Sequence, residues 1–131
     1  MKNLAPLAVV LLAGCATPGP TPEQIAALEL NKQRTMQALV DCAMANVSDF
    51  DDGISSALII GGALAGRCSK EFDDHMEAKL DTASNDAVRR ALYLRWTSPE
   101  RRAEILAPVV LKYRAAILKS PTLEQSGRKG G

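Results

Sequence analysis

Apolar residues recur three and four positions apart over most of the chain between Thr21 and Ser120, which is the period of an amphipathic helix. The first stripe ends at Phe50, and three more follow over residues 55–80, 85–97 and 98–117. An acidic turn, residues 49–53, separates the first two stripes. The pattern predicts an all-α protein, with a small bundle of about four helices forming a single domain over residues 23–120.

Two short motifs predict where helices begin. Thr21-Pro22-Glu23 and Ser98-Pro99-Glu100 each supply a capping hydroxyl, a proline and an acid in the order favoured in a first helical turn. Pro108 has no amide hydrogen to donate, so we expect it to kink the last helix. Aromatic residues make up only 4% of the chain and β-branched residues do not alternate, so composition also favours helices over a sheet.

The first fourteen residues have the layout of a secretory signal peptide, with one early lysine followed by a short apolar run. That run ends in Leu12-Ala13-Gly14-Cys15, which resembles the lipobox of bacterial lipoproteins. The resemblance implies removal of residues 1–14, cleavage before Cys15, and attachment of acyl chains such as palmitate to Cys15. With two or three acyl chains the membrane becomes the first expected partner, since multiple chains make release negligible.

The residues after the lipid-bearing cysteine predict where the domain is held. Ala16 is not the aspartate that lipoprotein resemblance associates with inner-membrane retention, which implies the periplasmic face of the outer membrane. Residues 15–22 form the lipidated N-terminus and a proline-rich tether, because closely spaced prolines favour extended backbone over helix. Residues 121–131 carry little apolar content and are expected to form a flexible tail.

Once Cys15 is assigned to lipid, Cys42 and Cys68 remain, each on the apolar stripe of one of two consecutive helices. A short turn between those helices would bring the two positions within bridging distance, and the periplasm is oxidising. We therefore expect a Cys42–Cys68 disulfide. A redox couple and a metal thiolate site are the alternatives, but the sequence lacks the close C-x-x-C spacing and a second ligand pair, so no metal is expected.

Charge is divided unevenly along the chain. Residues 23–81 hold eleven acids and five Lys/Arg, net −6, whereas residues 82–131 hold four acids and ten Lys/Arg, net +6. The halves either complement each other as antiparallel helices or leave a cationic surface for anionic lipid, lipopolysaccharide or an acidic partner. The candidate contacts on that surface are Arg89, Arg90, Arg95, Arg101, Arg102, Lys112 and Arg114. Nucleic acid is not an expected partner, because no groove-reading motif accompanies the charge.

Candidate chemistry is sparse, and we expect no catalytic residues, no cofactor and no enzymatic activity. His75, the one histidine, is expected on a solvated acidic face beside Asp74 and Glu77. The small residues of 61–66 allow close helix packing, expected in the core rather than at an oligomer face. Trp96 fits either a core position or an exposed interface anchor.

These features favour a membrane-anchored periplasmic lipoprotein with a non-catalytic helical domain that binds or scaffolds an envelope protein. The chain is similar to the secretin pilotins in size, lipid anchor, helical content and disulfide, a likeness that implies an accessory role in an envelope complex. The alternative is an interaction or inhibitor module that binds anionic lipid or lipopolysaccharide through the basic C-terminal half.

Overall fold

The computed structural model describes residues 19–120, and this range folds entirely as helices, without a strand. Five helices follow one another: α1 (Pro22–Phe50), α2 (Ala57–Arg67), α3 (Ser69–Asp81), α4 (Asp86–Thr97) and α5 (Pro99–Lys119). The all-α class is therefore confirmed. The signal peptide, the lipobox with Cys15, and the tail of residues 121–131 lie outside the described residues.

Both predicted helix starts are confirmed. Thr21 and Gln24 form a reciprocal capping box: the Thr21 hydroxyl accepts from the Gln24 amide at 3.2 Å, and the Gln24 side chain accepts from the Thr21 amide at 2.8 Å. The Ser98 hydroxyl accepts from the Arg101 amide at 3.1 Å, and Pro99 occupies the first position of α5. These contacts satisfy amide groups that have no partner inside their own helix.

The expected helix count of about four is one too low, because residues 55–80 form two helices instead of one. The chain turns at Cys68, whose φ of −99° and ψ of 33° end α2 and begin α3. Hydropathy changes at the same place: α2 is apolar apart from its last residue, Arg67, while α3 is strongly charged. The break lets α2 pack against α5 while α3 packs against α1.

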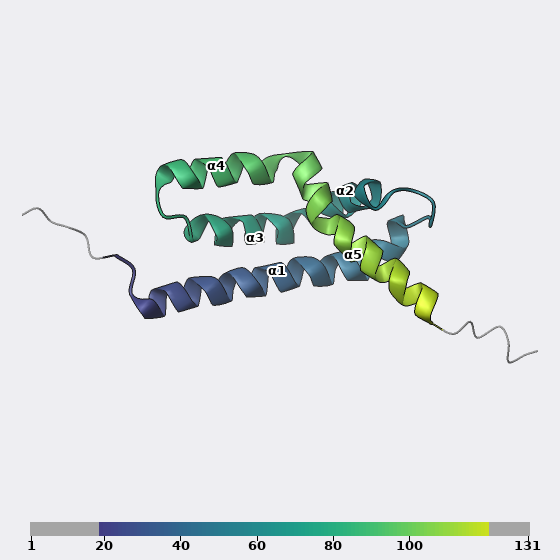
Figure 1. Cartoon of the computed structure of the whole chain (residues 1–131), viewed down its shortest axis with the longest axis horizontal. Coiled ribbons are helices and arrows are strands. Elements are labelled where there is room, and N and C mark those ends of the chain that lie inside the picture. The colour runs from purple at the N-terminus through teal and green to yellow at the C-terminus, as the bar shows by residue number, and fades with distance from the viewer. Residues whose placement is uncertain (1–18, 121–131) are drawn as a thin grey trace, which may run out of the picture.

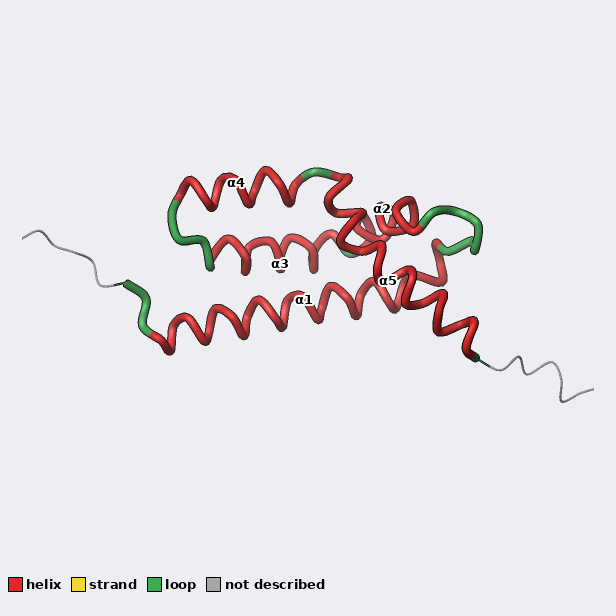
Figure 2. The backbone as a smooth tube through the Cα atoms, in the orientation of Figure 1, coloured by secondary structure: helices red, strands yellow, loops and turns green. Residues whose placement is uncertain are grey.

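The helices are arranged so that α2 and α3 together return along α1, and α4 folds back over α3 (Figure 1). The connections are short, and α5 crosses the far part of α1 next to α2 (Figure 2). The beginning of α1 and the α1–α2 loop consequently lie at opposite ends of the molecule.

The core lies where α1, α2, α3 and α5 overlap. Its fully buried side chains include Leu39, Val47, Leu64, Phe72, Leu106 and Val110. Helices α2 and α5 approach each other closely: a Cβ built on Gly61 would lie 2.6 Å from the Ala103 carbonyl oxygen. The backbones approach this closely only because Gly61 has no side chain. Helix α5 continues without interruption past Pro108, which lies on its exposed side.

Candidate functional site

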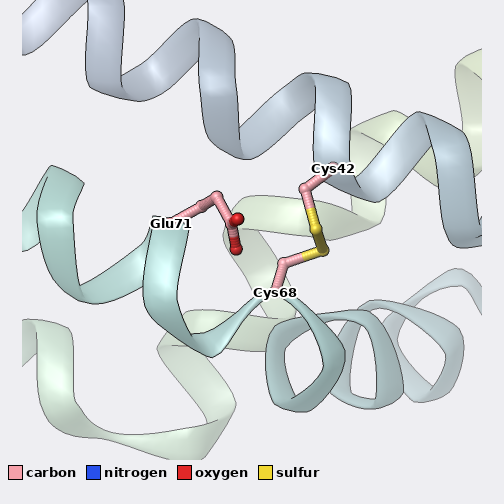
Figure 3. Close-up of side chains that lie close together, drawn as sticks. All are labelled: Cys42, Cys68 and Glu71. Carbon is pink, nitrogen blue, oxygen red and sulfur yellow. A yellow bond between two sulfur atoms is a disulfide. The ribbon is translucent and has the colours of Figure 1, made fainter.

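The structure brings together the two cysteines that the sequence predicted to pair. The sulfur atoms of Cys42, on α1, and Cys68, at the α2–α3 junction, are 2.07 Å apart, and their Cα atoms are 6.0 Å apart (Figure 3). The disulfide therefore fastens the turn between α2 and α3 to the middle of α1. The second cysteine is not inside a helix, as the sequence predicted, but at the residue where two helices meet.

A carboxylate lies beside this disulfide. Glu71, in the first turn of α3, places an oxygen within 4.8 Å of both sulfur atoms (Figure 3). Three such groups could bind a soft metal only if the sulfurs were thiolates, and here they are bonded to each other. The cluster is a structural crosslink with a neighbouring acid.

Four of the six arginines proposed as anionic-surface contacts form ion pairs. Arg89, Arg102 and Arg114 pair with Asp81, Asp73 and Asp51 of the acidic half, and Arg101 pairs with Glu104 on its own helix. Arg90 and Arg95, together with Lys112, are exposed and have no ion pair within residues 19–120. Three of these ion pairs therefore join the basic half to the acidic half and offset part of the charge asymmetry within the domain.

The Arg114–Asp51 pair is the most enclosed of these contacts. Arg114 Nε lies 3.1 and 3.0 Å from the two Asp51 carboxylate oxygens, and its Nη2 donates to the Ser55 carbonyl at 2.8 Å. The Asp51 side chain is 4% exposed, and the hydrogen bond from Arg114 lowers the pKa of its carboxyl group. This contact fixes the α1–α2 loop to α5.

The acidic turn itself serves the backbone. Asp52 accepts hydrogen bonds from the Ser55 hydroxyl and from the amides of Ile54 and Ser55, which lowers its pKa to about 2. Gly53 adopts a positive φ of 72°, which glycine tolerates without strain. The Asp51 carboxylate is therefore used in the ion pair with Arg114, and the Asp52 carboxylate holds the turn.

The expectation that His75 is solvated is wrong: the residue is 1% exposed. Its neighbours Asp74 and Glu77 do face solvent, but His75 lies one turn after buried Phe72, on the side of α3 that packs against α1. Burial, followed by the charge of Lys79, lowers the pKa of His75. The spacing of 68, 72 and 75 along the apolar stripe was the signal for this burial, which the local acidic composition hid.

Trp96, left open between core and interface by the sequence, belongs to the core. It is 7% exposed, packs edge-on against His75 with ring centroids 5.6 Å apart, and contacts Phe72 at 6.1 Å. The Lys79 ammonium group sits 4.1 Å from the centre of the Trp96 ring, a cation–π contact. Trp96 is also the only buried residue of α4, so it anchors that helix.

The contact between Thr35 and His75 contains the atoms of a hydroxyl nucleophile and a base. The Thr35 hydroxyl oxygen is 3.1 Å from His75 Nδ1 and also lies 3.0 and 3.1 Å from the Asn31 and Lys32 carbonyls. A hydroxyl that donates its single hydrogen to one of these carbonyls can only accept from Nδ1, and in that arrangement the ring does not act as its base. No acid orients the other ring nitrogen, and the pair is a packing contact.

One surface of the described domain stands out as apolar. Residues Ile59, Gly62, Ala63 and Gly66 share the solvent-facing side of α2, with Leu58 at its edge and Ile54 in the preceding loop; we call this set the open face of α2. Ile54, Leu58 and Ile59 are 91, 52 and 66% exposed. Leu58 belongs to the apolar stripe predicted over residues 55–80, so part of that stripe lies outside the core.

No protein-family model, curated protein or solved structure matches this chain. Among the described helices, none combines the length and the apolar character needed to cross a bilayer. Function is therefore inferred from the geometry of the described residues.

Proposed function

We propose that this protein is a lipoprotein anchored through Cys15 to the periplasmic face of the outer membrane, whose helical domain binds an apolar helical segment of an envelope protein. The observation that carries the proposal is the open face of α2. Single exposed apolar residues are ordinary on protein surfaces, but a helix that is apolar on both sides is normally buried on both.

The composition of this face favours a helix as its partner. Gly62 and Gly66 are one turn apart, and a Cβ on Gly66 would meet nothing within 4 Å. Small residues at that spacing let a second helix approach closely, while Leu58 and Ile59 supply apolar area at its flank. The expected partner chemistry is thus an apolar stripe on a helix.

The position of the open face also favours binding of a partner at a distance from the membrane. Helix α1 has 29 residues, which correspond to about 43 Å at 1.5 Å per residue. Helix α2, which bears the open face, lies near the end of α1 that is distant from Pro22 (Figure 1). Such a placement can hold a partner well away from the lipid anchor.

The alternative, binding of anionic lipid or lipopolysaccharide by the basic half, has weaker support. Four of its six arginines are ion-paired, three of them with the acidic half of the same domain. Of the six arginines, Arg90 and Arg95 are the two that form no ion pair within residues 19–120.

Site-specific photocrosslinking in intact cells tests the proposal. A photoreactive residue at Ala63 should give one dominant protein adduct, and mass spectrometry should map the link to an apolar helix of that protein. The same probe at Ala91, exposed on α4, is the matched control and should not give this adduct. Ile59→Glu should abolish the Ala63 adduct, because a charge on the open face opposes burial.

Three outcomes would refute the docking proposal. A predominantly lipid adduct would place the open face on the bilayer, an adduct with a second copy would make it a dimer interface, and equal labelling at Ala63 and Ala91 would mean no specific site. The anchor is tested separately: Cys15→Ser should leave a precursor that is neither acylated nor cleaved, read out by intact mass.

A further inference from the structure

A second, separate surface is a cavity of about 320 Å³ that opens between α1 and α3. Two of its lining residues, Met36 and Val40, are apolar, and the others are polar or charged: Lys32, Gln33, Gln37, His75 and Lys79. None of these residues belongs to α2. The cavity is therefore independent of the proposed docking face, and it can be tested without reference to it.

The charge in this cavity is unbalanced by one cation. Lys32 forms an ion pair with Glu29 at 2.6 Å. Lys79 has no ion pair within residues 19–120; its ammonium group rests on Trp96. Burial, and then the positive charges of Lys32, Arg101 and Arg95, lower the pKa of Lys79. A partly buried ammonium among other cations is unfavourable unless an anion joins it.

His75, which also lines this cavity, has a ring nitrogen without a hydrogen-bond partner among the described residues. Its Nδ1 lies 3.1 Å from the Thr35 hydroxyl oxygen, while its Nε2 is buried and has no hydrogen-bond partner within residues 19–120. Buried polar atoms are almost always hydrogen-bonded, so this nitrogen is an exception, on a residue that also lines the cavity.

We propose that this cavity binds a small amphipathic carboxylate, with the carboxylate paired to Lys79 and the hydrocarbon part against Met36 and Val40. A monovalent anion fits because Glu29 already neutralises Lys32, which leaves one positive charge to be matched. A phosphate dianion would leave excess negative charge and would make no use of the apolar wall.

Fluorescence titration tests this proposal, because Trp96 is the only tryptophan and touches both His75 and Lys79. Hexanoate added to the full-length protein in phosphatidylcholine vesicles should change the emission saturably and raise the melting temperature. Acetate should bind more weakly because it lacks the apolar part, and hexanol should not bind saturably because it lacks the charge.

Variants assign the contacts. Lys79→Gln should weaken hexanoate binding by about tenfold or more, the usual effect of losing a charge-assisted hydrogen bond. Lys70→Gln, on the exposed side of the same helix, is the matched control and should bind normally. Met36→Gln should weaken hexanoate while leaving acetate unchanged.

Lys79→Gln removes the ammonium group from the Trp96 ring and can by itself change the emission, so the melting temperature serves as an independent measure of binding. The carboxylate proposal is overturned if hexanoate neither saturates nor stabilises, or if Lys79→Gln and Lys70→Gln bind it equally well. It is also overturned if inorganic phosphate binds more tightly than hexanoate. None of these results would affect crosslinking at Ala63, so the carboxylate proposal can be wrong while the docking proposal is right, and the reverse.

Discussion

Two adjacent glycines in α2 should respond in opposite directions to the same substitution. Gly61 faces α5, and a Cβ there would lie 2.6 Å from the Ala103 carbonyl oxygen and 3.0 Å from the Ala107 amide nitrogen. Gly62 faces outward, where a Cβ would meet only the Ala103 Cβ at 3.8 Å, an ordinary contact. Gly61→Ala should therefore destabilise the domain, and Gly62→Ala should stabilise it.

The magnitudes follow from two opposing effects. Replacing glycine with alanine inside a helix gains about 1 kcal/mol at either position. Overpacking costs about 1–3 kcal/mol, and Gly61→Ala should cost about 3 because the atoms it meets are backbone and cannot rotate away. The net effects are a loss of about 2 kcal/mol for Gly61→Ala and a gain of about 1 kcal/mol for Gly62→Ala.

Thermal unfolding with the disulfide intact measures both changes. For a domain of this size the melting temperature should fall by about 10 °C in Gly61→Ala and rise by about 5 °C in Gly62→Ala. Gly66→Ala, which meets nothing within 4 Å, is a further control and should not destabilise. If Gly61→Ala were as stable as Gly62→Ala, α2 could not pack on α5 through Gly61, and the outward placement of the open face would be refuted as well.

The remaining predictions concern the disulfide and the buried histidine. Reducing the Cys42–Cys68 bond, which spans 26 residues, should lower the free energy of unfolding in urea by about 3.5 kcal/mol. A Cys42→Ala/Cys68→Ala variant should not respond to the reductant. If the urea midpoint of the wild-type protein did not change on reduction, this prediction would be wrong. His75 has a pKa below its ordinary value of 6.5 in the folded state, so the unfolded chain takes up the proton more readily. The contribution of neutral His75 to stability should therefore be fully present above about pH 6.5 and should decline as the pH falls below that value. Thermal unfolding between about pH 5 and 8 measures this change. An equal pH dependence in His75→Gln would assign it to other groups.

Local signals in the sequence predicted helix starts well because the causes are local. The capping side chain, the proline and the first amides of α1 and α5 lie within four residues of one another, as Thr21 with Gln24 and Ser98 with Arg101 show. The break at Cys68 was missed because its cause is not local. The chain turns there so that α2 meets α5 and α3 meets α1, and apolar residues continue at helical spacing through the turn.

Side-chain burial was predicted less well, for a related reason. Apolar spacing identifies a face, but only the length over which helices overlap decides which part of that face is covered. Ile25 and Ile117 lie on predicted stripes yet are exposed, because they are near helix ends that extend past their neighbours. His75 shows the converse: its acidic neighbours predicted solvent, whereas its place one turn after Phe72 determined burial.

The charge asymmetry says more about the fold than about a partner. Had the two halves been independent, each net charge of six would have created a strong field for a ligand of opposite sign. Instead Arg89, Arg102 and Arg114 reach from the basic half to acids of the other half. Part of what the sequence displays as two blocks of charge is, in the folded chain, a set of three ion pairs between α4 or α5 and the helix and loop that precede them.

The small residues of α2 lie on two sides of the helix, although the sequence predicted only packing in the core. Gly61 and Ala65 face inward, where close packing against α5 uses them as predicted. Gly62 and Gly66, each one residue later, repeat the same spacing on the outside. A helix needing only one packed side could carry polar residues at 59, 62, 63 and 66, as the outer sides of α1 and α3 do. That it carries none is the reason to seek a second helix there rather than a ligand for the arginines.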